Sequence, residues 1–178
     1  MFSVFWQIEL QKKRATGFIK ITMVTFRPIT PKDYAAVNAI GTAEYPRNYY
    51  ECDNSFESKM SGYPHGCAVA DLDGIVGYVI SFPYVLGRPF PLGEIYSPVE
   101  NPDCYYIHDL CVLKEFRGKG IAKQLAKVAL NNTWAAVALV SVLNTTKFWE
   151  KLGFRGFAEI KYGGQKAEYM LCIRDKLL

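Results

Sequence analysis

The sequence predicts one α/β domain built on a mixed sheet, in which some strands pair as hairpins and others flank helices. Strand-like apolar runs occur both as neighbours joined by a turn and on either side of amphipathic segments, which argues against a purely doubly wound sheet. The 178 residues suffice for one domain with a sizeable core and are too few for two ordinary domains. We expect residues 1–22 to be a peripheral N-terminal extension and residues 23–178 to form the single domain.

The domain is predicted to begin with a strand and two helices. Val24–Arg27 forms the strand. Thr30 places a hydroxyl at the N-cap of the next element, and Pro31 occupies its first helical position, a combination that starts helices. A second, short helix is expected over Asn54–Met60.

A hairpin and a long loop follow the predicted helices. Cys67–Asp71 and Ile75–Ser81 flank the turn-forming Leu72–Asp73–Gly74, which indicates two antiparallel strands. The proline- and glycine-rich segment Phe82–Asp103 is about 20 residues long, more than connections in compact domains normally need. Loops of this length are often functional, so we expect this one to contribute to a site.

The second half of the chain alternates strands and helices. The predicted elements are a strand at Cys104–Leu113, a helix at Gly118–Asn131, a strand at Ala135–Ser141, a helix at Asn144–Leu152, and strands at Phe154–Lys161 and Ala167–Ile173.

Composition excludes several classes of protein. A formal net charge of +4, with basic residues spread along the chain, does not make the dense basic stripe of a nucleic-acid binder. No apolar run reaches the ~18–20 residues that span a bilayer. Five cysteines without a Cys-x-x-Cys pair, and only two histidines, fit neither a disulfide framework nor a zinc site. We expect a cytoplasmic monomer or homodimer with reduced core cysteines and no metal, membrane or nucleic-acid partner.

The strongest chemical signal is the loop Arg117–Ala122, between a predicted strand and a predicted helix. A helix N-terminus offers unpaired N–H groups and a partial positive charge, and Gly118 and Gly120 let those amides approach an anion closely. A pyrophosphate is the natural ligand. The spacing matches neither a P-loop nor Gly-x-Gly-x-x-Gly. The alternative is a tight glycine turn with solvated lysines.

Two segments in register resemble the GNAT superfamily of N-acetyltransferases. Arg117-Gly-Lys-Gly-Ile-Ala122 is similar to its Arg/Gln-x-x-Gly-x-Gly/Ala motif, and Asn144-Thr-Thr-Lys-Phe-Trp-Glu-Lys-Leu-Gly-Phe154 is similar to its second signature. The order of elements from Phe26 to Ile173 matches as well. The resemblance implies a mostly antiparallel sheet flanked by helices, acetyl-CoA as cosubstrate, and acetylation of a primary amine by direct attack on the thioester.

The same resemblance implies which residues hold acetyl-CoA. Backbone groups at Leu110 and Val112 match those that pair with the pantetheine arm, and Asn144 matches a side chain that contacts it. Trp149 lies where many members have a tyrosine that protonates the leaving thiolate, so the general acid is open, with Tyr106 or Tyr84 as substitutes. The pyrophosphate would be held by the amides of Arg117, Gly118, Lys119, Gly120, Ile121 and Ala122.

His108 is the candidate general base, because imidazole titrates near neutrality and alkylamines are mostly protonated near pH 7. Strand alternation predicts that Tyr106, His108, Leu110 and Val112 share one face. The His-x-Leu-x-Val arrangement resembles the arylalkylamine N-acetyltransferase branch, although Tyr106 stands where that branch has a second histidine. The alternative for His108 is a hydrogen-bonded histidine in a half-buried strand.

Aromatic residues interleaved with carboxylates predict a cationic acceptor, through cation–π contact and charge pairing. The expected substrate is therefore a small aromatic amine or a polyamine. A protein N-terminus or lysine, and an acyl-CoA sensor without catalysis, remain alternatives. The candidate acceptor residues are Tyr45, Tyr49 and Tyr84, within a set that also includes Tyr50, Phe56, Phe90, Tyr96, Glu44, Glu51, Asp53, Glu94 and Glu100.

Overall fold

The computed structural model describes residues 6–13 and 19–174. Its strands are β1 (Trp6–Lys13), β2 (Ile19–Pro28), β3 (Ala68–Asp71), β4 (Ile75–Tyr84), β5 (Cys104–Val112), β6 (Ala136–Ser141), β7 (Arg155–Tyr162) and β8 (Gln165–Ile173). Its helices are α1 (Tyr34–Glu44), α2 (Asp53–Gly62), α3 (Ile121–Leu130) and α4 (Thr146–Glu150). Single 3-10 turns are η1 (Pro31–Asp33), η2 (Arg47–Tyr49), η3 (Pro64–Gly66) and η4 (Lys114–Phe116).

Over the described residues, the strands form one eight-stranded sheet in the order β1-β2-β3-β4-β5-β6-β8-β7. All neighbouring strands are antiparallel except β5 and β6, which are parallel. The predicted mixed, mostly antiparallel α/β fold is therefore confirmed. Every element expected from the sequence occurs, with boundaries moved by a few residues.

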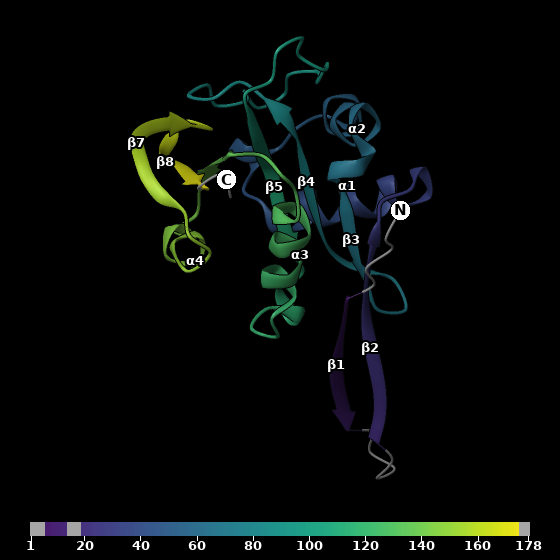
Figure 1. Ribbon diagram of the computed structural model, residues 1–178. Helices are drawn as coiled ribbons and strands as arrows, with labels where there is room; N and C mark the ends of the chain where they lie inside the picture. Colours follow the sequence, from purple (N-terminus) through teal and green to yellow (C-terminus); the bar gives the residue numbers. More distant parts are fainter. Residues whose placement is uncertain (1–5, 14–18, 175–178) are drawn as a thin grey trace.

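The first strand was not predicted from the sequence. β1 pairs with β2 from Trp6 opposite Phe26 to Lys13 opposite Ile19, so the predicted extension carries the edge hairpin of the sheet. Figure 1 shows this hairpin projecting away from the rest of the molecule. The signal was present, since residues 6–10 alternate apolar and polar side chains, the pattern of a half-buried strand.

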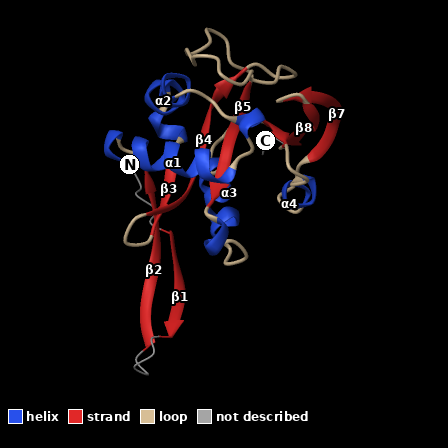
Figure 2. Ribbon diagram, turned by 180° about the vertical axis from the view of Figure 1, so that it is seen from behind, coloured by secondary structure: helices blue, strands red, loops and turns tan. Residues whose placement is uncertain are grey.

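Helices cover both faces of the sheet (Figures 1 and 2). On one face α1 and α2 contribute Val37 and Phe56 to a buried cluster that also contains Tyr78 of β4. On the other face α3 and α4 contribute Leu125 and Trp149 to a second cluster. The sheet therefore separates two apolar cores, as expected for a layered α/β domain.

A β-bulge in β5 changes which side chains share a face. Ile80 of β4 pairs with Asp109, but the next residue of β4 pairs with Ile107, so His108 is the extra residue. Tyr106 therefore lies in the α1/α2 cluster, whereas Leu110 packs against the α3 cluster. The prediction that Tyr106, His108, Leu110 and Val112 share one face was wrong, because strict alternation ends at the bulge.

β5 and β6 separate beyond a short parallel ladder. Their pairing runs only from Tyr105 opposite Val137 to Ile107 opposite Leu139. From His108 to Val112, β5 keeps β4 as its neighbour on one side, while no strand of the described chain pairs with its other edge. The two strands thus open a cleft bordered by unpaired backbone groups.

The long loop between β4 and β5, residues 85–103, folds against α2 and the C-terminal strands. Gly93 donates its N–H to Glu51 at 2.7 Å, and the Glu94 carbonyl accepts from the Ser55 hydroxyl at 2.9 Å. Tyr162 of β7 donates to the Phe90 carbonyl at 2.7 Å. The loop is therefore held against the α2 region and β7 by hydrogen bonds.

Two expectations about the chain concern membranes and cysteines. In residues 6–13 and 19–174, no helix has the length and apolar character to cross a membrane. Cys67, Cys104 and Cys111 are buried as free thiols, as expected for core cysteines. Cys52 is exposed, so the interpretation of all five as core residues was wrong at that position.

Candidate active site

A cavity of about 400 Å³ occupies the cleft between β5 and β6. Leu110 and Val112 of β5 line one side, and Leu139 of β6 lines the other. Arg117 and Ala122 lie at the end where α3 begins. The cavity thus runs from the unpaired edge of β5 to the predicted phosphate loop.

The phosphate loop presents a continuous row of backbone donors. Gly118 and Gly120 have φ values of +75° and +82°, a region where glycine is favoured because it lacks a Cβ. Among the described residues, the amides from Gly118 through Lys123 donate to no backbone or side-chain oxygen. Unpaired amides at the start of a helix suit a phosphate group, so this loop fits the diphosphate of an acyl-CoA.

The Arg117 side chain holds the loop in place. Its Nε donates to the Val112 carbonyl at 2.9 Å, and its terminal nitrogen binds the Glu44 carboxylate of α1. Glu44 also accepts the Lys114 N–H at 3.0 Å. Arg117 therefore joins the end of β5, the loop and α1, while its backbone carries the anion-binding geometry.

The second signature segment contains two residues with left-handed backbone. Leu143 and Asn144 have φ values of +52° and +59°, which are uncommon for residues other than glycine and often mark functional sites. Leu143 lines the cavity between β5 and β6, but Asn144 lines an adjoining groove of about 550 Å³ beside Glu168. Trp149 lines the cavity between β5 and β6 and is only 6% exposed, packed between the rings of Phe148 and Phe154.

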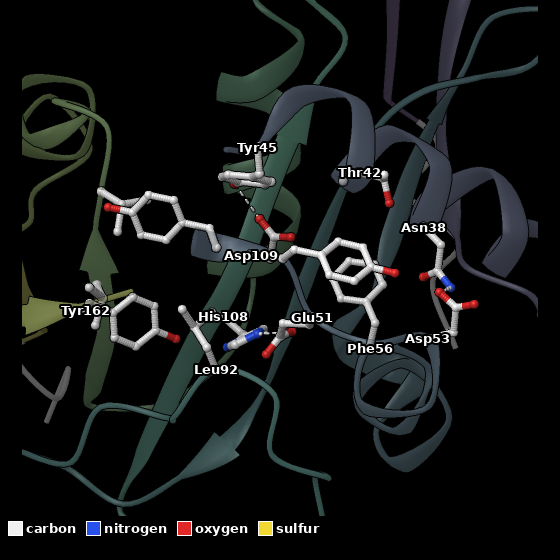
Figure 3. A pocket seen from close by; sticks show the side chains of 15 residues that line it. Asn38, Thr42, Tyr45, Glu51, Asp53, Phe56, Leu92, His108, Asp109 and Tyr162 are labelled. Atoms are coloured by element: carbon white, nitrogen blue, oxygen red, sulfur yellow. Dashed lines mark hydrogen bonds and ion pairs between the residues drawn. The ribbon is translucent and has the colours of Figure 1, made fainter. Parts of the chain in front are cut away.

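A second, smaller cavity of about 60 Å³ lies next to the first (Figure 3). The two cavities share Tyr45, His108 and Asp109 as lining residues. Tyr49 and Tyr162 line the smaller cavity and not the cavity between β5 and β6. The structure thus brings the predicted base and two predicted acceptor tyrosines together at one junction.

His108 is held by one nitrogen and free at the other. Its Nε2 lies 3.0 Å from the Glu51 carboxylate, and its side chain is only 3% exposed. Its Nδ1 is buried and has no hydrogen-bond partner in the part of the chain that the structure describes. With Nε2 donating to an ionised Glu51, Nδ1 carries the lone pair.

Glu51 is the centre of a buried charge network. The Lys59 ammonium lies 3.2 Å from the same carboxylate oxygen that binds His108, and it also donates to the carbonyls of Ser55 and Glu94. Burial raises the pKa of Glu51, but His108, Lys59 and the Gly93 N–H outweigh it and bring the pKa down to about 2. Burial lowers the pKa of Lys59, and Glu51 opposes that shift. Glu51 is therefore ionised at neutral pH.

Asp109 lies between two phenols, the buried Tyr78 and the half-buried Tyr45. Tyr45 and Tyr78 each donate a hydroxyl to its carboxylate at 2.6 Å. Burial raises the pKa of Asp109, and the two tyrosine hydrogen bonds oppose the shift. The Tyr45 hydroxyl is also 3.4 Å from the Leu110 carbonyl, so it sits at the junction of the two cavities.

Two predicted site residues lie elsewhere. Tyr106 is 1% exposed and Tyr84 is 5% exposed, and both pack in the aromatic cluster around Phe82. Neither lines either of the two cavities. We therefore leave Tyr106 and Tyr84 out of the proposed site.

Sequence reasoning missed Lys59 and Asp109, and it named Glu51 only as one of several carboxylates near the acceptor. Glu51 precedes α2 and Lys59 lies in its last turn, and Glu51 meets both Lys59 and His108 only in the folded chain. Asp109 offered a signal, since a carboxylate inside an apolar strand segment requires partners.

Residues 34–154 match the model of the acetyltransferase (GNAT) family. The chain therefore belongs to the GNAT acetyltransferase family, whose members use a CoA-based acyl donor. A search of curated proteins finds no match.

Several solved structures share the fold at low identity. Ard1 from Thermoplasma volcanium is 20% identical with a TM-score of 0.68, covering 84% of this chain and 97% of its own. Naa50 from Arabidopsis thaliana, in complex with a bisubstrate analogue, is 17% identical with a TM-score of 0.64, covering 83% and 97%. The loading GNATL domain of CurA from Lyngbya majuscula is 13% identical with a TM-score of 0.72, covering 84% and 97%.

Proposed function

We propose that the protein transfers an acetyl group from acetyl-CoA to a primary amine, with His108 as general base. The observation that carries this proposal is the position of His108 where the two cavities meet, with a buried and unpaired Nδ1. A buried nitrogen without a partner costs free energy in a resting protein, and a substrate N–H removes that cost.

The donor site is the cavity between β5 and β6, which fits acetyl-CoA along its whole length. The free amides of the Arg117–Ala122 loop would hold the diphosphate, and the unpaired edge of β5 at Leu110 and Val112 would pair with the pantetheine amides. Acetyl-CoA supplies the electrophilic thioester carbonyl. These contacts carry over from the family resemblance, and the geometry of the loop and the free edge supports them. No metal takes part in this proposal.

His108 would remove the proton that the attacking amine must lose. An alkylamine has a pKa of about 10.4, so its neutral form is scarce at pH 7. His108 Nδ1 accepts the proton while its Nε2–H stays bound to Glu51, whose negative charge stabilises the resulting imidazolium. The thiolate that leaves has a pKa of about 8.5 and departs without strong acid assistance, and the Trp149 indole cannot supply a proton.

A protein N-terminus is the second candidate acceptor. The observation in its favour is the likeness to Ard1 and Naa50, at 20% and 17% identity. Against it, Asn48 of η2 donates to the Gly163 carbonyl in the β7–β8 turn at 2.9 Å. This bond joins the two segments next to Tyr49 and Tyr162, which line the smaller cavity, and so narrows the access that an extended chain would need.

Release of CoA, followed with a thiol reagent over aliphatic amines, aryl amines and short peptides, tests the proposal. Wild type should turn over at least one amine class, and His108→Ala should reduce kcat/KM by about 10²–10⁴-fold. Turnover unaffected by His108→Ala would remove His108 as the base. Saturable acetyl-CoA binding without turnover of any acceptor would favour an acyl-CoA sensor.

A further inference from the structure

The smaller cavity is lined by His108, whose side chain is buried, and by Asp53, which is exposed, so we take His108 as its inner end and Asp53 as its outer end. Asp53 is exposed at the start of α2, and the Asn38 amide of α1 lies 3.4 Å from its carboxylate. Figure 3 shows this pair set apart from the His108–Glu51 pair, with the Phe56 ring between them in that view. The cavity thus offers one polar group inside and another at its mouth.

Both ends present hydrogen-bond acceptors. His108 Nδ1 and Asn38 Oδ1 are each buried and have no partner among the described residues. The carboxylates of Glu51, Asp53 and Asp109 also line the cavity, and its described lining includes no lysine or arginine. Unpaired acceptors in an acidic cavity match a ligand that carries N–H donors and positive charge at both ends.

The size of the cavity limits the ligand to a narrow chain. A water-sized group needs about 10–15 Å³ of such space, so a cavity of about 60 Å³ takes roughly four to six of them. An alkyl chain fits that room and can run along the face of Phe56, whereas a phenyl ring with its linker exceeds it. This favours an aliphatic acceptor over the aromatic amine that the sequence suggested.

We propose that the acceptor is a short aliphatic diamine, whose far ammonium rests at Asp53 while its reactive amine reaches His108. This inference rests on the proposed function and names its substrate class. Asp53 and Asn38 would hold the distant ammonium by charge and hydrogen bonding. The aromatic rings of Tyr49 and Phe56 also line the cavity and suit an alkylammonium.

The test compares 1,4-diaminobutane with butylamine, which has the same chain and lacks the second ammonium. Wild type should favour the diamine in kcat/KM by roughly three- to fivefold, the size expected for a partly exposed ion pair. Asp53→Asn should bring that ratio close to one. Glu100→Gln is the control. It removes an exposed carboxylate of the long loop that does not line the smaller cavity, and it should keep the wild-type ratio.

Calorimetric titration of both amines into the acetyl-CoA-free protein separates this inference from the proposed function. Tighter binding of 1,4-diaminobutane than butylamine, lost in Asp53→Asn, supports the diamine site even if no product forms. Two results would overturn the diamine site and leave the acetyltransferase intact. One is turnover of both amines by wild type at equal kcat/KM, and the other is a preference lost in Glu100→Gln as much as in Asp53→Asn. Preference for 2-phenylethylamine or a peptide over both would overturn it as well.

Discussion

The buried ammonium of Lys59 lies 3.2 Å from the Glu51 oxygen that binds His108 at 3.0 Å. One carboxylate oxygen therefore serves a fixed cation and the proposed base at once. The side chain of Lys59 is fully buried, and that of Glu51 is 4% exposed. Electrostatic interactions at such depth are stronger than on the surface, so each member of the network affects how readily His108 takes a proton.

Lys59→Met should move the acid limb of the kcat/KM profile to higher pH. Without the ammonium, the whole negative charge of Glu51 stabilises the protonated imidazole, and His108 becomes an active base only at higher pH. The other groups that face His108 are unchanged, namely Glu51 from the start of α2, Asp109 beside it on β5, Tyr45 from the end of α1 and Tyr162 from β7.

The matched control for Lys59→Met is Lys127→Met, because Lys127 is an exposed lysine of α3. It should leave the profile in place. A Lys59→Met profile that loses amplitude at every pH without shifting would show that Lys59 only stabilises the fold. Circular dichroism of the folded variant accompanies the measurement.

Glu51→Gln should make stability less sensitive to acid. Wild-type Glu51 has a folded pKa of about 2, below its ordinary value of 4.5. Because the folded pKa is depressed, the stabilisation is present above pH 4.5 and is lost as the pH falls toward 2. The linkage amounts to at most about 3 kcal/mol.

Urea unfolding at pH 6 and pH 3 measures this effect for Glu51→Gln. The difference in unfolding free energy between the two pH values should be smaller in the variant than in wild type. If the difference in unfolding free energy were the same in both proteins, the buried partners of Glu51 would not lower its pKa.

Gly118→Ala should raise the KM for acetyl-CoA, by roughly three- to tenfold, because an alanine at φ +75° strains the loop that presents its amides. Gly164 in the β7–β8 turn has φ +74°, and a Cβ at either glycine would meet nothing within 4 Å. Gly164→Ala therefore carries the same backbone strain away from the loop. Equal increases of KM in both variants would argue against diphosphate binding at residues 117–122.

Asn48→Ala should widen the acceptor site. Asn48 forms the side-chain bridge to Gly163, and a Cβ on Gly163 would lie 2.6 Å from the Asn48 carbonyl, so the two segments approach closely. Loss of the bridge should raise kcat/KM for 2-phenylethylamine relative to butylamine by a few-fold. Asn54→Ala, at an exposed position of α2, is the control. An unchanged ratio would show that the bond between Asn48 and Gly163 does not select the acceptor.

The sequence predicted the elements that local patterns specify. Thr30 is the N-cap of η1, the 3-10 turn that leads into α1, and its N–H donates to the Asp33 carboxylate at 2.8 Å. Gly118 and Gly120 indicated the anion loop because their spacing and position before a helix have a direct backbone consequence. These features depend on neighbouring residues, which a sequence displays.

The parts that sequence reasoning missed depend on contacts between distant segments. The extra residue at His108 follows from pairing with β4, and no local pattern marks it. The partnership of His108 with Glu51 spans 57 positions, and its extension to Lys59 needs the helix start to fold onto β5. Tyr84 looked like a loop residue available to substrate, but it ends a core strand and packs on Phe82.

Mass spectrometry of the amine product tests the central claim most directly. Acetyl-CoA and either 1,4-diaminobutane or butylamine are incubated with wild type, His108→Ala and His65→Ala. The last is the control, because His65 is the other histidine of the chain and is exposed. We expect acetylated amine with wild type and His65→Ala, and a rate about 10²–10⁴-fold lower with His108→Ala. Acetylated amine formed at the wild-type rate by His108→Ala would contradict it.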